Sequence, residues 1–164
     1  MTPTPRPRIL IVRSCRMAQL LAAIVWARTR NRTAEIVALS HRGHRYLLYA
    51  AGADRVIEVP GRRFGLVRVA PWLWRLRAER FAEVVIPQMN ANPAEHANLY
   101  QMIAALHPPR VTIIAGDERP QTLDGPRFTQ YALQHSCVGP LARWNGPVLA
   151  RMFLSACLNY RHAA

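Results

Sequence analysis

The first clear pattern along the chain is an unbroken apolar run followed by apolar residues at helical spacing. Residues 9–12 read Ile-Leu-Ile-Val, and a short run rich in β-branched residues is typical of a strand buried on both faces of a parallel sheet. After the turn at residues 13–16, helical spacing and alanines predict a helix. The residues that carry this spacing are Met17, Leu20, Leu21, Ile24 and Val25. In open α/β sheets such a strand-to-helix turn lies at the carboxyl edge of the sheet, where ligands bind.

Further apolar runs extend the same pattern. Residues 34–39, 84–86 and 111–115 are predicted strands, and residues 46–51 and 95–106 are predicted helices. The fold class that we expect is α/β: one three-layer domain over residues 8–138 with a parallel sheet of about five strands. An extended Pro-rich leader, residues 1–7, precedes the domain. A helical tail, residues 139–164, follows it.

One stretch resembles a known family. Residues 12–21, Val-Arg-Ser-Cys-Arg-Met-Ala-Gln-Leu-Leu, are similar to the first strand-turn-helix of the ADP-heptose:lipopolysaccharide heptosyltransferases. That motif reads apolar strand, basic residue, short polar turn, Met or Ile, Gly, Asp, then an apolar helix. Residues 52–59 and 80–87 resemble the family's entries into its third and fourth strands. The resemblance covers about residues 8–116 and implies the N-terminal, acceptor-side, Rossmann-like half of a GT-B glycosyltransferase.

The chain departs from this family at the position that does the chemistry. Ala18 falls on the family's Gly and Gln19 on its Asp, which the family is regarded as using to activate the acceptor hydroxyl. A neutral amide accepts no proton near neutral pH, and general base catalysis typically contributes about 10²- to 10⁴-fold. With 164 residues, the chain is long enough for one domain but not for the family's donor half. We therefore assign no catalytic residue and no cofactor.

Charge and cysteine content narrow the class of protein. The formal net charge is +13, all 22 basic residues are Arg, and 16 of these precede Phe81. The absence of Lys fits a GC-rich genome, but an Arg-rich face also suits anionic lipid headgroups, nucleic acid or an acidic protein surface. The arginines are dispersed and no nucleic-acid-binding signature accompanies them, which argues against specific nucleic-acid binding. Three widely spaced cysteines and the absence of a signal peptide or apolar span predict a cytoplasmic chain.

Two segments mix basic and apolar residues in the manner of an interaction surface. In residues 64–77 Trp and Leu are interleaved with Arg, as at a headgroup interface. The alternative is that Leu66, Val69, Leu73 and Leu76 form the core face of a crossover helix with Arg on its solvent side, and both interpretations can hold together. A helix beginning near Pro147 could either pack back on the sheet or dock into a partner. The predicted interaction residues are Arg62, Arg63, Arg68, Trp72, Trp74, Arg75, Arg77, Arg151, Met152, Phe153 and Tyr160.

Smaller clusters leave other sites open. Residues 41–45, His-Arg-Gly-His-Arg, would repel a metal cation, so we expect no metal site but keep an anion-binding loop as an alternative. Asn90, Asn92 and His96 could line the same cleft as Gln19 or cap the helix 95–106.

Three functional hypotheses follow. The first is a non-catalytic accessory or scaffolding subunit, derived from a glycosyltransferase half-domain and docked peripherally on the cytoplasmic face of a bacterial membrane complex or its anionic lipids, with no span of its own. The second is the acceptor-binding half of a split heptosyltransferase-like enzyme whose donor domain is another chain. The third is a nucleic-acid-binding protein.

Overall fold

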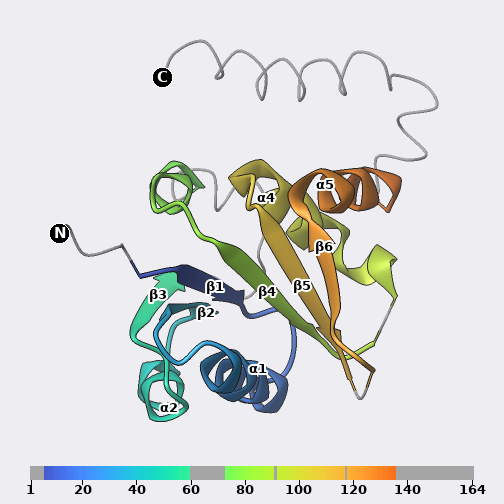
Figure 1. The fold of residues 1–164 in the computed structure, drawn as a ribbon. Helices are drawn as coiled ribbons and strands as arrows, with labels where there is room; N and C mark the ends of the chain where they lie inside the picture. The colour runs from blue at the N-terminus through green and yellow to red at the C-terminus, as the bar shows by residue number, and fades with distance from the viewer. Residues whose placement is uncertain (1–5, 60–72, 91, 117, 136–164) are drawn as a thin grey trace, which may run out of the picture.

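A six-stranded sheet forms the middle layer of the fold (Figure 1). The computed structural model describes residues 6–59, 73–90, 92–116 and 118–135. The strands are β1 (Arg8–Val12), β2 (Glu35–His41), β3 (Arg55–Val59), β4 (Glu83–Gln88), β5 (Arg110–Ala115) and β6 (Gln121–Asp124). The helices are α1 (Met17–Arg30), α2 (Arg45–Ala50), α4 (Ala97–Leu106) and α5 (Gly125–Gln134), with a 3-10 turn at Pro93–His96. Residues 73–78 are also helical.

The strand order is β3-β2-β1-β4-β5-β6, and only β6 runs antiparallel to its neighbour. The chain therefore builds the sheet outward from β1 to β3, then returns to the other side of β1 and builds outward again. This is the Rossmann-like doubly wound arrangement, whose order reverses between β1 and β4. Ile11 pairs with Ala38 of β2 on one side and with Val85 of β4 on the other.

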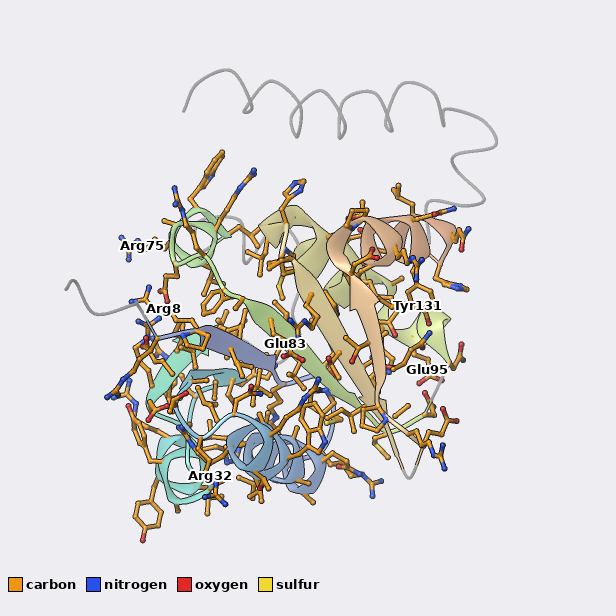
Figure 2. All side chains as sticks on the ribbon, viewed as in Figure 1. Arg8, Arg32, Arg75, Glu83, Glu95 and Tyr131 are labelled. Atoms are coloured by element: carbon orange, nitrogen blue, oxygen red, sulfur yellow. The ribbon has the colours of Figure 1, made fainter. Side chains whose placement is uncertain are left out.

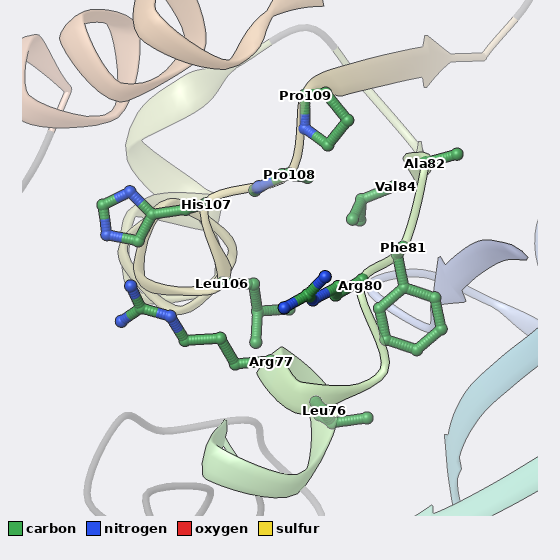
Figure 3. Close-up of a pocket in the computed structure, with 10 residues that line it drawn as sticks. All are labelled: Leu76, Arg77, Arg80, Phe81, Ala82, Val84, Leu106, His107, Pro108 and Pro109. Carbon is green, nitrogen blue, oxygen red and sulfur yellow. The ribbon is translucent and has the colours of Figure 1, made fainter. Parts of the chain in front are cut away.

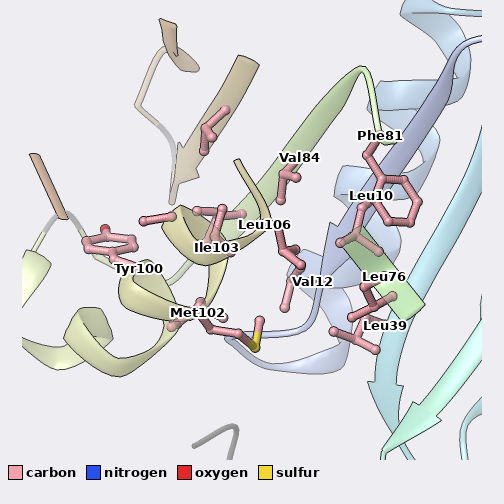
Figure 4. Close-up of a cluster of buried hydrophobic side chains, with 14 of the residues drawn as sticks. Leu10, Val12, Leu39, Leu76, Phe81, Val84, Tyr100, Met102, Ile103 and Leu106 are labelled. Carbon is pink, nitrogen blue, oxygen red and sulfur yellow. The ribbon is translucent and has the colours of Figure 1, made fainter. Parts of the chain in front are cut away.

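Alternating side chains along each strand create two apolar layers. Leu10 and Val12 of β1 belong to the cluster beneath residues 73–78, α4 and α5, which Figure 4 shows. Ile9 and Ile11 point to the other face and pack against α1 and α2. All four side chains are 3% exposed or less. Because both faces are covered, the strands are apolar at nearly every position, as parallel strands require.

The predicted α/β class and its three-layer arrangement are confirmed. The predicted strands at 9–12, 34–39, 84–86 and 111–115 match β1, β2, β4 and β5, with ends that differ by up to two residues. The sixth strand was not predicted, because Gln-Thr-Leu-Asp has one apolar residue and lies at the exposed edge of the sheet. The helix expected at 95–106 begins instead at Ala97, after the 3-10 turn. The leader's first five residues and the predicted tail, 139–164, lie outside the described residues.

Within the described part of the chain, no helix combines the length and apolar character that crossing a membrane requires.

Candidate functional site

An open cleft of about 620 Å³ lies at the carboxyl edge of the sheet, where the strand order reverses. We call it the switch-point cleft. Its walls come from the β1–α1 turn, the end of β2, the residue after β4, the 3-10 turn and the start of α4. The lining residues are Arg13, Ser14, Cys15, Arg16, His41, Met89, Glu95, His96, Asn98 and Leu99.

Hydrogen bonds to both neighbouring strands fix the β1–α1 turn. The backbone N–H of Arg13 donates to the carbonyl of Leu39, at 2.9 Å. The hydroxyl of Ser14 donates to the carbonyl of Pro87 in β4. Arg16 is the N-cap residue of α1, and its side chain makes no capping hydrogen bond. The turn is therefore tied to β2 and β4, and the amino end of α1 begins at the rim of the cleft.

Basic groups outnumber acidic groups around the cleft. Arg13 and Arg16 come from the turn, and no acidic residue occupies the first turn of α1. Glu95 is the one carboxylate among the lining residues. The amide nitrogens of Asn90 and Asn92 each donate to an oxygen of Glu95 over 3.3 Å. The cleft therefore favours an anion, because two guanidinium groups and only one carboxylate are among the residues that line it.

Two imidazoles add hydrogen-bonding capacity. Burial lowers the pKa of His41 below its ordinary value of 6.5, and the nearby Arg13 and His44 lower it further against an opposing backbone hydrogen bond at Val59. Burial also lowers the pKa of His96, while Glu95 acts in the opposite direction. The Nε2 atom of His96 is buried without a hydrogen-bond partner among the described residues. Both rings are therefore neutral at neutral pH, and His96 lines the cleft with one buried ring nitrogen unpartnered among the described residues.

The chemistry that the cleft can perform by itself is limited. Burial raises the pKa of the Cys15 thiol to about 11, against weaker lowering by the backbone at Ser14 and by Arg13. A thiol with that pKa is protonated near neutral pH and is a poor nucleophile. The described residues contain no cluster of three His, Cys, Asp or Glu side chains that could hold a metal ion. The arrangement is suited to binding an anion.

The structure brings together some of the residues predicted from the sequence and separates others. His96 and the first residue of the 41–45 loop join the 13–16 turn in one cleft. Gln19 is half-buried in the first turn of α1 and is not among the residues that line the cleft. Its Oε1 atom is buried with no hydrogen-bond partner in the described part of the chain. Asn90 and Asn92 bind Glu95, whereas the N-cap of α4 is His96.

Met89, Asn98 and Leu99 were not predicted as site residues. They follow the end of β4 along the chain, as ligand-contacting residues at a switch point do. Sequence reasoning identified the end of β4 and could have identified them from that position.

Three of the predicted interaction residues fall on described segments. The Trp74 side chain is 58% exposed, Arg75 is exposed and Arg77 is half-buried. Arg62, Arg63, Arg68, Trp72, Arg151, Met152, Phe153 and Tyr160 lie outside the described residues.

Comparison of the chain with protein-family models, curated proteins and solved structures gave no match.

Proposed function

We propose that this domain is a binding module for a small anionic ligand, phosphate- or carboxylate-bearing, held in the switch-point cleft. The main support is that two arginines and two imidazoles line one cleft at the point where the strand order reverses. They come from the β1–α1 turn, the end of β2 and the 3-10 turn. This position is where open α/β domains bind ligands. The module transfers no group by itself.

Two physical features support an anion over other ligands. The amino end of α1 presents unpaired backbone N–H groups and the positive end of the helix dipole to the rim. The guanidinium groups of Arg13 and Arg16 can each donate two parallel hydrogen bonds to a phosphate or carboxylate. The neutral rings of His41 and His96 can donate or accept at the remaining ligand atoms without adding a fixed charge.

Titration calorimetry of the full chain tests this proposal. The probes are inorganic phosphate, pyrophosphate, a nucleoside diphosphate and a nucleotide sugar. We expect at least one probe to bind. The double variant Arg13→Gln, Arg16→Gln should bind that probe at least about tenfold more weakly, because charge-assisted hydrogen bonds are lost. Arg32→Gln is the matched control, since Arg32 is exposed beyond the far end of α1 (Figure 2).

Two results would contradict the proposal. The first is that none of the four anions produces heat or raises the melting temperature. The second is that the double variant binds the anion with the affinity of the parent chain. Preference for the nucleotide sugar over the nucleoside diphosphate would count against the acceptor-binding half of a split glycosyltransferase, because that hypothesis places the nucleotide-sugar donor on another chain.

A second candidate function is peripheral attachment to a membrane complex or its anionic lipids, as a non-catalytic accessory subunit. The observation that favours it is the division of residues 73–78 into two faces. Leu76 is 1% exposed and Leu73 packs against the core, while Trp74 and Arg75 face outward. An exposed Trp beside an Arg suits a headgroup interface.

Vesicle sedimentation tests the second candidate. The full chain should sediment with vesicles that contain anionic lipid and less with neutral vesicles, and Trp74→Ala should reduce the bound fraction. Leu133→Ala is the control, because Leu133 is another exposed apolar residue, 51% exposed on α5. Equal loss with both variants, or no sedimentation of the parent chain, would contradict attachment through Trp74.

A further inference from the structure

A second pocket, of about 350 Å³, lies at the opposite edge of the sheet (Figure 3). It opens between the end of the 73–78 helix, the entry to β4 and the turn from α4 into β5, and we call it the amino-edge pocket. The lining residues are Leu76, Arg77, Arg80, Phe81, Ala82, Val84, Leu106, His107, Pro108 and Pro109.

The lining of the amino-edge pocket is amphipathic. The side chains of Leu76, Phe81 and Leu106 belong to the apolar core and are each 7% exposed or less. Arg77, Arg80 and His107 contribute cationic or hydrogen-bonding groups, and no acidic residue is among the ten that line the pocket.

The acidic residue next to this group in sequence is engaged elsewhere. The carboxylate of Glu79 forms an ion pair with Arg55, and the backbone carbonyl of Glu79 accepts a hydrogen bond from Arg8 over 3.3 Å. Glu79 is therefore not among the residues that line the pocket.

Backbone conformation points to the same pocket independently. Arg80 and His107 are the two non-glycine residues with positive φ in the described part of the chain, each with φ of 51°. Each follows or ends a helix, at positions where glycine is the usual residue because it has no Cβ. A bulky polar side chain at both positions is unfavourable for the backbone alone, and both side chains line one pocket. Such outliers concentrate where a side chain has a functional role.

One wall of the pocket is held in place. The backbone N–H of Gly125, at the start of α5, donates to the carbonyl of Pro109 over 3.0 Å. A Cβ at Gly125 would lie 2.4 Å from the carbonyl oxygen of Pro108, so α5 packs directly on this turn. Together with the fixed φ of two prolines, this contact gives a wall that is formed before a ligand arrives.

We propose that the amino-edge pocket binds a small amphiphilic anion, with its apolar part against Leu76, Phe81 and Leu106 and its carboxylate or phosphate head at Arg77, Arg80 and His107. The volume is at the lower end of the range for small-molecule sites, roughly 300–1,000 Å³. Apolar lining with a few convergent polar groups is the usual composition of such sites. This site is separate from the switch-point cleft, so either proposal can fail without the other.

The test compares four probes by titration calorimetry with the full chain carrying Arg13→Gln and Arg16→Gln, so that anion binding at the switch-point cleft does not contribute to the measured heat. Octanoate and octyl phosphate carry both parts of the proposed ligand, 1-octanol lacks the charge and inorganic phosphate lacks the apolar part. We expect one or both octyl anions to bind at least about tenfold more tightly than 1-octanol and inorganic phosphate. The stronger of the two octyl anions identifies the head group.

Glycine variants separate a binding role from a structural one. Arg80→Gly and His107→Gly remove the side chain and suit the positive φ, so each should keep or raise the melting temperature while weakening the octyl anion by about tenfold. Arg119→Gln, exposed beyond the carboxyl end of β5, is the control and should change neither quantity. The proposal is overturned if neither octyl anion binds, if 1-octanol or inorganic phosphate binds equally well, or if both glycine variants retain the parent affinity.

Discussion

At the scale of single residues, the two imidazoles of the switch-point cleft link stability to pH. An unfolded His takes up a proton near its ordinary pKa of 6.5, whereas folded His41 and His96 do so only at lower pH. Below about pH 6.5 the unfolded state therefore binds more protons, and the free energy of unfolding falls as the solution is acidified. A bound anion reverses this effect, because it favours the protonated rings.

We therefore expect these two histidines to have little effect on the melting temperature of the free protein above pH 6.5. Between pH 6.5 and 5 they should lower it. His96→Gln should flatten part of that fall, and a saturating anion should flatten it as well. Thermal unfolding across this pH range is the measurement. If the melting temperature of His96→Gln falls with pH as steeply as that of the parent chain, His96 does not contribute to the pH dependence.

Gln19 supports a prediction about activity. If it occupies the position of a catalytic Asp, the isolated chain should release no nucleotide from a nucleotide-heptose with a lipid A-type acceptor, because a neutral amide accepts no proton. Coupled measurement of nucleotide release tests this. Turnover above background that Gln19→Ala abolishes would refute it. Activity that appears only with a second chain and rises in Gln19→Asp would support the split enzyme.

The residues of the site could be predicted only in part. The 13–16 turn follows a strongly apolar strand, so its place at the carboxyl edge could be inferred from the sequence alone. His96 joins it from more than 75 residues further along the chain, which depends on β4 lying beside β1. The position of the Gln19 side chain depends on the rotation of α1 against the sheet, and motif order does not determine this.

At the scale of elements, a buried hydrogen-bonded chain joins the last three strands. Glu83 of β4 is 5% exposed and accepts a hydrogen bond from the Thr112 hydroxyl of β5 over 2.6 Å. The Thr122 hydroxyl of β6 lies 3.0 Å from Thr112 Oγ1. Because Thr112 donates its hydrogen to Glu83, Thr122 donates to Thr112. The edge strand is thus linked to the interior through a polar contact.

Thr112→Val should destabilise the fold by about 1–3 kcal/mol, because it leaves the buried Glu83 carboxylate without this donor. Thr122→Val is the matched control and should have a smaller effect, since Thr122 is exposed and Glu83 keeps its donor. Urea unfolding of both variants measures the difference. Equal destabilisation by the two variants would show that the carboxylate does not depend on Thr112.

The sheet was predicted with about five strands instead of six because the edge strand β6 is held by polar contacts and not by an apolar run. The inner strands are continuous apolar runs, which a sequence reveals directly. The side chains of β6 are Gln, Thr, Leu and Asp, and its pairing rests on the backbone and on the Thr112–Thr122 contact. The sequence did contain a local indication that a helix begins directly after β6. Asp124 is the N-cap of α5 and accepts a hydrogen bond from the backbone N–H of Arg127, and a Pro occupies the first turn.

At the scale of the whole molecule, the membrane attachment that we propose as the second candidate function should be sensitive to salt, because the net charge is +13. The Debye length shrinks from about 10 Å at 0.1 M to about 3 Å at 1 M, so contacts of arginines such as Arg75 weaken while apolar contacts persist. High salt alone should release part of the protein from native membranes. Deletion of residues 147–164 together with high salt should release nearly all of the protein, because the charged and the apolar contacts contribute independently. Full solubility at low salt would contradict this attachment.

The strand order also has a consequence for how the protein matures during synthesis. Residues 8–59 supply β1, β2 and β3, and residues 83–124 supply the other half of the sheet. Folding during translation proceeds from the N-terminus, yet the switch-point cleft needs both halves, because Ser14 bonds to Pro87 and His96 forms the opposite wall. A ligand that binds only the joined state stabilises it by mass action. Hydrogen exchange should therefore slow in both halves together when the ligand is present, because the ligand stabilises only the state in which the two halves have joined.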